Sequence, residues 1–409
     1  MTNKIILFNL NTYIGGGETL LVRYAEYLSR KNIDYAILCA AKDSWIESSA
    51  ASKGLEIIKW PVKDDSLIYT RNQIPLVRKR LELELNSAET LKVFTFCMRD
   101  YVNSILVFGE SSLNVELFHG LYHPHDYEYL SSLAFNKSSY HKYFKSHLHQ
   151  LYVNRSVLFM NLHGAIGSIG CDVKEDDLIL RPIPIALNDN KICVGSVLSE
   201  KKIICISRFA AFKIGAIVAF LRFSRHRRDV KFTLVGHGPF EWLVRFLVWR
   251  WSLKNITIQS GISPDELGAL IMDNTIGYAQ GTSILEIAKF GIPVIIAPYS
   301  RLRDVFNRNF TTFGTFGFVQ QQFEFGDLTY FEGAPRLSLN SEFDKILSDY
   351  PSFVSGTLDT IKRFEADAIF NEITNDITSG SILVRDIPAI TIRPPLVKRI
   401  ILSIKRVLV

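Results

Sequence analysis

The chain has 409 residues, of which 47% are hydrophobic and 22% are charged. This composition excludes a largely disordered chain, and the length predicts two or three domains. The net charge of +6 at pH 7 is too small to indicate nucleic acid as a partner. Five cysteines are scattered without a Cys-x-x-Cys pair, so neither a zinc knuckle nor a disulfide framework is indicated, and a reducing compartment is expected.

The first apolar segment, Ile5 to Phe8, is too short for the core of a signal peptide. No segment reaches about 18 consecutive apolar residues, the length that a membrane-spanning helix needs. We therefore expect a cytoplasmic protein. Peripheral contact with the inner face of the plasma membrane stays compatible with that localisation.

The first half of the chain alternates short apolar segments with longer amphipathic ones. The predicted strands cover residues 4–10, 35–40, 91–97 and 115–119. The predicted helices cover residues 18–31, 70–85 and 125–153, and residues 11–17 are expected to form a loop. Such alternation predicts a parallel sheet flanked by helices, which is the α/β class.

Pro182 and Pro184, followed by Asn188-Asp189-Asn190, mark a domain boundary. A second α/β series follows, with strands at 202–207, 231–235, 255–259, 275–279 and 293–297 and helices at 240–253, 263–272 and 282–290. We expect a Rossmann-like domain at 1–185, a linker at 186–200, a second Rossmann-like domain at 201–375 and a tail at 376–409. Ligands of such sheets bind at the carboxyl ends of strands, so the cleft between the domains is the expected site.

Three glycines, Gly15, Gly16 and Gly17, follow the first predicted strand. Glycine lets a backbone approach a ligand closely, and the start of the next helix offers N–H groups to an anion. The spacing differs from the Gly-x-Gly-x-x-Gly pattern of classical NAD sites. An ordinary turn between a strand and a helix is the alternative interpretation.

Two loops of the second series carry further candidates. Arg208 and Lys213 follow the strand at 202–207, where two cations suit a diphosphate. Gly236 begins a Gly-His-Gly-Pro turn after the strand at 231–235, and its backbone can line a pocket. A solvated turn and a tight structural turn are the respective alternatives.

A third loop of this series opens the predicted helix at 282–290. Gly281, Thr282 and Ser283 place N–H donors and hydroxyls at the positive end of that helix. Glu286 lies one turn further on, where a carboxylate can accept hydrogen bonds from sugar or ribose hydroxyls. The alternative for Glu286 is an acid that only stabilises the helix dipole.

Taken together, these motifs resemble those of the retaining GT-B glycosyltransferases of family 4, the group 1 class. The resemblance rests on the order of the elements and on the glycine loop, the Arg208–Lys213 pair, the Gly236 turn, residues 256–261 and residues 281–295. The last segment is similar to the family's Gly-x4-Glu-Ala-x3-Gly-x-Pro-Val-Ile pattern. The family implies an α/β GT-B fold with two Rossmann-like domains, and a UDP-, GDP- or dTDP-sugar as donor.

By this resemblance, Arg208 and Lys213 hold the donor diphosphate, the backbone from Gly281 to Ser283 adds contacts to it, and Glu286 binds the ribose. The family has another glutamate eight residues before the second one, where this chain has Tyr278. Gln280 is the polar residue that stands nearby. The departure keeps a catalytically inactive binding or scaffold module as an alternative function.

His119 ends the strand at 115–119, and the family has a histidine at a similar place that faces donor sugar and acceptor. His123 and His125 complete a His-x3-His-x-His cluster, which makes metal binding a second interpretation. The chain has no Asp-x-Asp motif, which fits a metal-independent transferase. The resemblance implies no cofactor.

The sequence thus predicts a hexosyltransferase-type enzyme that moves a sugar from a nucleotide-sugar to a glycan or a lipid-linked saccharide. Retention of configuration and a setting in bacterial surface-polysaccharide synthesis, such as O-antigen, capsule or lipopolysaccharide, are implied by the resemblance alone. A nucleotide-sugar epimerase of the same fold is the other alternative.

Two segments combine cations with apolar residues. The helix at 240–253 carries Trp242, Trp249 and Trp251 beside arginines, and either a core helix or a membrane interface fits this pattern. Residues 396–409 have a basic and an apolar face at helical spacing, which suits an anionic leaflet or docking onto the protein. An anionic membrane surface is therefore a candidate partner.

Overall fold

The computed structural model describes residues 3–12, 16–41, 44–63, 67, 70–86, 88–121, 137–169, 174–187, 200–211, 213–262, 264–298, 311–319 and 337–388. The chain divides into unit 1, residues 1–184 with 367–409, and unit 2, residues 185–366. Several predicted features lie outside the described residues: Gly15, the linker at 188–199, His123, His125 and the tail from residue 389 on.

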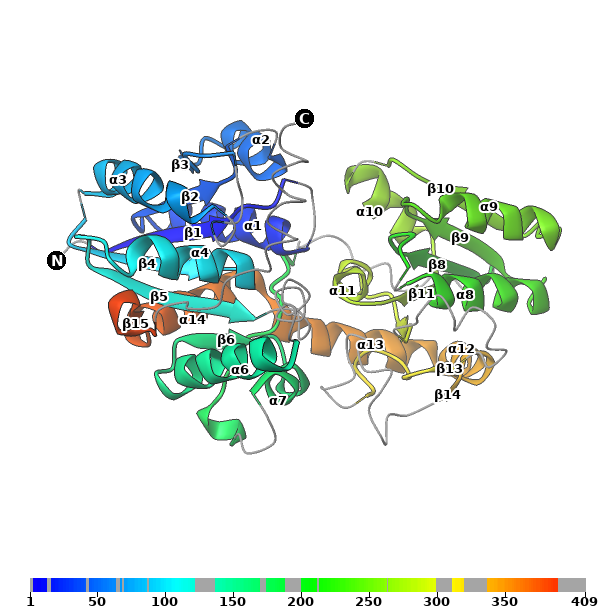
Figure 1. Ribbon diagram of the computed structural model, residues 1–409. Coiled ribbons are helices and arrows are strands. Elements are labelled where there is room, and N and C mark those ends of the chain that lie inside the picture. The colour runs from blue at the N-terminus through cyan, green and yellow to red at the C-terminus, as the bar shows by residue number, and fades with distance from the viewer. Residues whose placement is uncertain are drawn as a thin grey trace. The chain divides into compact units, whose positions relative to one another are not determined.

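Unit 1 is built on a sheet with the order β3-β2-β1-β4-β5-β6-β7, parallel throughout, to which β15 adds an antiparallel pairing with β5 (Figure 1). Its strands are β1 (Asn3–Asn9), β2 (Tyr35–Cys39), β3 (Ile57–Lys59), β4 (Thr90–Thr95), β5 (Val115–Leu121), β6 (Val157–Phe159), β7 (Ile179–Leu180) and β15 (Ile382–Leu383). Its helices are α1 (Gly16–Arg30), α2 (Trp45–Ser52), α3 (Ile74–Leu85), α4 (Met98–Phe108), α6 (Lys137–Val153), α7 (Leu162–Ile169) and α14 (Ala366–Ser379). The strand order reverses between β1 and β4, and ligands of open α/β sheets bind at such a switch point.

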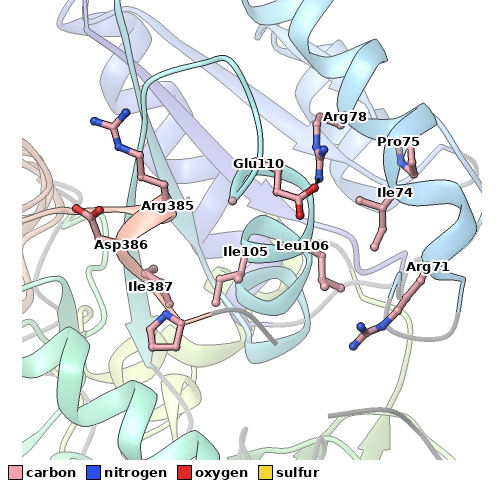
Figure 2. Close-up of a pocket in the computed structure, with 12 residues that line it drawn as sticks. Arg71, Ile74, Pro75, Arg78, Ile105, Leu106, Glu110, Arg385, Asp386 and Ile387 are labelled. Atoms are coloured by element: carbon pink, nitrogen blue, oxygen red, sulfur yellow. Dashed lines mark hydrogen bonds and ion pairs between the residues drawn. The ribbon is translucent and has the colours of Figure 1, made fainter. Parts of the chain in front are cut away.

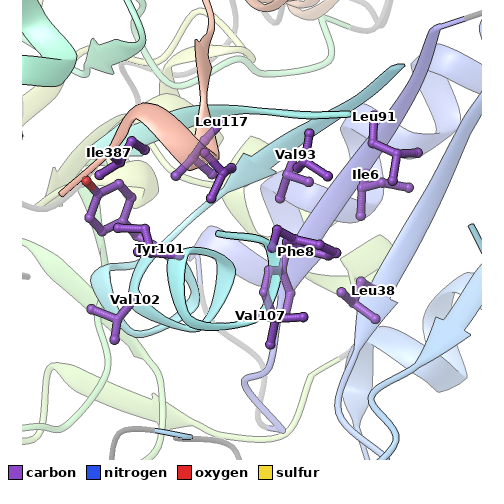
Figure 3. Close-up of a cluster of buried hydrophobic side chains, with 14 of the residues drawn as sticks. Ile6, Phe8, Leu38, Leu91, Val93, Tyr101, Val102, Val107, Leu117 and Ile387 are labelled. Atoms are coloured by element: carbon purple, nitrogen blue, oxygen red, sulfur yellow. The ribbon is translucent and has the colours of Figure 1, made fainter. Parts of the chain in front are cut away.

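The core of unit 1 lies where α4 covers the sheet (Figure 3). Phe8 of β1 and Leu117 of β5 are fully buried, as is Tyr101 of α4. Ile387, near the end of the described chain, joins the same cluster. Both faces of the central strands are covered, which explains why β1 and β2 have continuous apolar sequences rather than alternating ones.

Unit 2 has a five-stranded parallel sheet with the order β10-β9-β8-β11-β12. The strands are β8 (Lys202–Ile206), β9 (Lys231–Val235), β10 (Ile256–Gln259), β11 (Ile276–Ala279) and β12 (Val294–Ile296), and a separate antiparallel pair joins β13 (Thr311–Thr312) to β14 (Leu337–Ser338). The helices are α8 (Ile214–His226), α9 (Glu241–Arg250), α10 (Pro264–Met272), α11 (Thr282–Ala288), α12 (Leu339–Ser348) and α13 (Tyr350–Ile361). Here the order reverses between β8 and β11.

The two-domain, Rossmann-like α/β fold predicted from the sequence is confirmed, with local corrections. The strand expected at 91–97 ends at Thr95, because Cys97 is the extended N-cap of α4, a helix that the sequence analysis did not predict. Helix α1 begins at Gly16 rather than at Glu18.

The chain returns to unit 1 at Asp367, earlier than the expected domain end at 375. Helix α14 is held there by polar contacts of its C-terminal half. Arg181 donates two hydrogen bonds to Asp376, at 2.7 and 3.0 Å, and the hydroxyls of Tyr24 and Thr374 lie 2.9 Å apart. These contacts place the last described helix in the first unit.

Candidate functional site

The carboxyl edge of the unit 2 sheet carries most of the residues predicted to bind a donor. Arg208 and Lys213 follow β8, and Gly281 follows the neighbouring strand β11. Lys213 Nζ lies 3.5 Å from the main-chain oxygen of Gln280, so the two loops meet across the switch point. Arg208 is exposed on the same loop as Lys213.

The Gly236 turn packs directly on the loop that carries Arg208. Phe209 donates its N–H to the carbonyl of His237 at 2.9 Å and accepts one from Phe240 at 3.0 Å. Gly236 has a φ of +152°, and a Cβ there would lie 1.9 Å from the carbonyl oxygen of Ser207. Glycine at 236 is therefore required by the packing of two loops, whether or not a ligand is bound.

The turn into α11 is more open. Gly281 has a φ of +66°, which favours glycine, but a Cβ there would meet no atom of the described residues within 4 Å. Thr282 and Ser283 are partly exposed beside it. Glu286 accepts a hydrogen bond from Lys289 at 2.7 Å, so a ribose hydroxyl bound by Glu286 would share that carboxylate with a lysine. The backbone at 281 thus has room for a ligand.

Tyr278 lies inside the core rather than at the edge of the sheet. Its ring is almost fully buried and stacks on Phe220 at 5.5 Å, and its hydroxyl donates to the carbonyl of Ala216 at 3.4 Å. Burial raises the pKa of the Tyr278 hydroxyl well above its usual range. Gln280, not Tyr278, is the polar residue where β11 ends. The position at which the resemblance led us to expect a glutamate is therefore a core position in this chain.

In unit 1, the glycine loop leads straight into α1. Gly16 and Gly17 form the first turn of that helix, and a Cβ on either would meet no described atom within 4 Å. Packing among the described residues does not require glycine here. The backbone there is open to close approach by a ligand, which stays a prediction.

A polar network that the sequence analysis missed lies at the switch point of unit 1. Asn11, after β1, donates through its side-chain amide to the carboxylate of Glu18, and Arg99 Nη2 donates to Asn11 Oδ1 at 2.9 Å. The Asn9 side chain lies 3.5 Å from the same Glu18 carboxylate and is almost fully buried. Amides and carboxylates grouped in this way suit the hydroxyl groups of a saccharide.

Asp100 anchors the other side of this network. It is fully buried, accepts a hydrogen bond from Cys97 Sγ at 2.8 Å and lies 3.3 Å from Arg99 Nε. Burial raises the pKa of the Asp100 carboxyl, against the opposing effect of Arg99. The sequence signal was the charged pair Arg99-Asp100 shortly after an apolar strand, which the overlong strand prediction concealed.

His119 lies within β5 and is fully buried. Its Nδ1 is 2.8 Å from Thr95 Oγ1, and the ring packs 5.4 Å from that of Tyr101. Among the described residues its Nε2 has no hydrogen-bond partner. Burial lowers the pKa of His119 to about 3, so the imidazole is neutral at physiological pH. Burial thus favours the neutral form of His119, and its contact with donor sugar and acceptor stays a prediction.

Unit 1 also contains a pocket of about 600 Å³ between α3, α4 and the end of the described chain. Figure 2 shows Arg78 beside Glu110 on one side of it and Arg385 with Asp386 on the other. Arg78 donates to Glu110 and to the carbonyl of Val107, both at 2.9 Å. None of the predicted site residues that the structure describes lines this pocket, so it lies apart from the candidate site.

In the part of the chain that the structure describes, no group of histidine, cysteine and acidic residues could hold a metal ion. No helix in that part is long and apolar enough to cross a membrane.

No protein-family model matches the sequence, and no curated protein matches it significantly. Solved structures do match. A glycosyltransferase from Rickettsia africae is 14% identical with a TM-score of 0.63, over 92% of this chain and 98% of that one. The lipopolysaccharide outer core galactosyltransferase WaaB is 11% identical with a TM-score of 0.59, over 92% and 99%. The chain has the GT-B fold.

The GT-B fold also occurs in another class of enzyme that the chain resembles. The UDP-GlcNAc 2-epimerase from Neisseria meningitidis, solved with UDP-GlcNAc bound, is 10% identical with a TM-score of 0.55, over 92% of this chain and 99% of that one. At such identities the likeness shows the fold alone. The GT-B prediction is confirmed, and retention and membership of family 4 stay predictions.

Proposed function

We propose that this GT-B protein is a glycosyltransferase that moves a sugar from a nucleotide-sugar to a hydroxyl group of a glycan or lipid-linked saccharide. The observation that carries the proposal is the meeting of Lys213 with the carbonyl of Gln280 at the carboxyl edge of unit 2. Two cations on one loop, beside the open backbone at Gly281, suit a diphosphate. That diphosphate is the leaving group of a nucleotide-sugar.

In the proposed reaction, Arg208 and Lys213 neutralise the charge that develops on the diphosphate as its bond to the sugar carbon breaks. The acceptor hydroxyl forms the new bond to that carbon, and its proton passes to a diphosphate oxygen. We assign Glu286 to the ribose and the Gly281–Ser283 backbone to the phosphates. Charge neutralisation by arginine and lysine makes the reaction metal-independent, and attack from the face that the leaving group vacates gives retention.

We further propose that the polar network of unit 1 receives the acceptor. Asn11 and Arg99, with Asn11 bonded to the buried Glu18, bring hydrogen-bonding groups of both kinds to the switch point. A bacterial surface polysaccharide is the acceptor class that we propose, and the fold of the lipopolysaccharide galactosyltransferase WaaB is in keeping with it.

The epimerase alternative is favoured by one observation, the match to the N. meningitidis UDP-GlcNAc 2-epimerase. Product analysis separates the two functions. The chain is incubated with UDP-, GDP- or dTDP-sugars, with and without a saccharide acceptor, and the products are identified. A glycosyltransferase forms the free nucleoside diphosphate and a lengthened acceptor. Conversion of the donor to its epimer without acceptor would instead establish an epimerase.

A further inference from the structure

The solvent face of α9 is formed by large aromatic and basic side chains. Trp242 is 66% exposed, Phe246 47% and Trp249 73%. These positions follow one another at helical spacing, so they form a single stripe, and the rings of Phe246 and Trp249 lie 5.9 Å apart. Arg245 and Arg250 are exposed on the same face. An ordinary surface helix exposes charged and polar residues there instead.

The opposite face of α9 already holds the helix on unit 2. Val244 is fully buried, and Leu243, Leu247, Val248 and Trp251 pack against the unit 2 core. The exposed aromatic residues are therefore not needed to attach the helix. The exposure of Trp242 and Trp249 does not fit the core-helix interpretation, whereas Trp251 packs on the core, and contact with a membrane stays a prediction.

The chain around this stripe is rich in basic residues, although Arg227, Lys231 and Lys202 pair with acids outside it: Asp344, Glu200 and Asp273. Residues 201–260 contain twelve Lys and Arg but only two acids, Asp229 and Glu241. Glu241 is paired with Arg245, and Asp229 with Arg227. The Asn255 side chain bonds the carbonyls of Ser224, Arg227 and Val230 at 3.0 to 3.1 Å, which ties the segment that carries the exposed Arg225 and Arg228 to the chain shortly after α9.

We propose that this face, Trp242, Arg245, Phe246, Trp249 and Arg250, docks on an anionic lipid bilayer. Tryptophan is favoured at the boundary between headgroups and acyl chains, because its ring is apolar and its N–H is polar. Arginines around it attract anionic headgroups, each contributing about 1 kcal/mol near the surface. A second copy of the chain fits less well, because its identical basic surroundings would repel this one.

The test is binding of the full chain to vesicles, followed by co-sedimentation and by tryptophan fluorescence. Vesicles of phosphatidylcholine alone are compared with vesicles that contain about 30% phosphatidylglycerol. We expect binding to the anionic vesicles alone, with a blue shift of the fluorescence and a loss of binding at high salt. The triple variant Trp242→Ser/Phe246→Ser/Trp249→Ser is expected to lose at least about tenfold in affinity.

A further variant tests the arginines separately from the aromatic residues, and a control variant removes exposed apolar residues elsewhere. Arg245→Gln/Arg250→Gln should weaken binding about 30-fold, which is about 2 kcal/mol at 1.4 kcal/mol per decade. The matched control, Leu76→Ser/Leu83→Ser, removes two apolar residues that are 61% and 64% exposed on α3, and should bind as the wild type does.

Three outcomes overturn the proposal. One is a wild-type chain that ignores anionic vesicles, and another is a triple variant that binds them as well as the wild type, which would assign binding to the tail at 389–409. The third is a wild-type chain that forms a dimer and a triple variant that is a monomer, with equal vesicle binding by both. This result would assign the face to a second copy of the chain. Circular dichroism and thermal melting show whether each variant is folded.

Discussion

The ammonium group of Lys213 lies 3.5 Å from the main-chain carbonyl oxygen of Gln280, across the switch point between β8 and β11. This contact joins the loop of Arg208 and Lys213 to the turn that opens α11. A carbonyl oxygen is a weak partner for an ammonium group compared with a phosphate. The cation is therefore placed to exchange one for the other when a diphosphate binds.

Replacement of Lys213 by alanine tests this placement. We expect Lys213→Ala to cost about 2–4 kcal/mol of transition-state stabilisation, seen as a fall in kcat/KM of roughly 30- to 1,000-fold, because the leaving diphosphate loses a cation. Thermal stability should change little, since the side chain is only partly buried. Lys231→Ala is the matched control: Lys231 begins β9 at the opposite edge of the same sheet and pairs with Glu200. Equal loss in both variants would contradict the assignment.

Variants of Tyr278 should separate the stability of unit 2 from its binding of a donor. Tyr278→Phe removes a long hydrogen bond to the carbonyl of Ala216 and is expected to cost about 1 kcal/mol of stability, with donor affinity unchanged. Tyr278→Glu should unfold unit 2, because it buries a carboxylate beside Phe220. Denaturant melts and donor titrations measure the two effects. Loss of donor affinity in a fully stable Tyr278→Phe variant would place this residue in the site after all.

The glycines of the two units should respond differently to an added methyl group. Gly236→Ala places a Cβ against the carbonyl of Ser207 and should destabilise unit 2 by about 2–4 kcal/mol. Gly17→Ala meets no described atom and should leave stability unchanged or raise it by about 0.5–1 kcal/mol, since alanine favours a helix. If a ligand approaches α1, Gly17→Ala should still lower activity. A Gly17→Ala enzyme of full activity would remove this turn from the site.

The lowered pKa values of two buried histidines predict that the folded protein loses stability in acid. His119 has a pKa lowered to about 3 by burial, while the unfolded chain takes up that proton near pH 6.5. The unfolded state therefore binds more protons between these values, and stability falls as the pH drops from about 6.5 toward 3, by about 1.4 kcal/mol per unit. His147, lowered to about 4, adds to the same effect.

His119→Asn isolates the first contribution, because asparagine keeps a polar group near Thr95 but does not titrate. The variant should show a shallower loss of stability between pH 6 and pH 4 in denaturant melts at each pH. His149→Asn, at an exposed position of α6, is the control and should follow the wild type. An unchanged slope in His119→Asn would mean that this histidine is already charged in the folded protein.

Unit 2 could be predicted well from the sequence, because its strands are short apolar segments bounded by glycine, proline and charged residues. The segment at 231–235 corresponds to β9 without correction. Helix α4 was missed because Phe96, Cys97 and Met98 continue the apolar run of β4 up to the start of the helix, so that no change of period separates the two. That error also concealed Arg99 and Asp100, whose meeting with Asn11 depends on the sheet order and not on spacing along the chain.

The burial or exposure of individual side chains was harder to predict from the sequence than the strands and helices. The burial of His119 and of Tyr278 follows from helices packed over the ends of their strands, which no local pattern reports. The exposure of Trp242 and Trp249 was equally undetermined, because tryptophan in an amphipathic helix is more often buried. Tertiary packing decided each case.

Thermal stability of the full chain in a panel of UDP-, GDP- and dTDP-sugars tests the central claim most directly. A ligand at 100 times its Kd should add about 2.7 kcal/mol of stability, which is readily measured. We predict that one nucleotide class stabilises the wild type and the Lys231→Ala control but not Lys213→Ala or Arg208→Ala. If no member of the panel stabilises the folded wild type, or if all four proteins respond alike, the donor site proposed at the carboxyl edge of unit 2 is wrong.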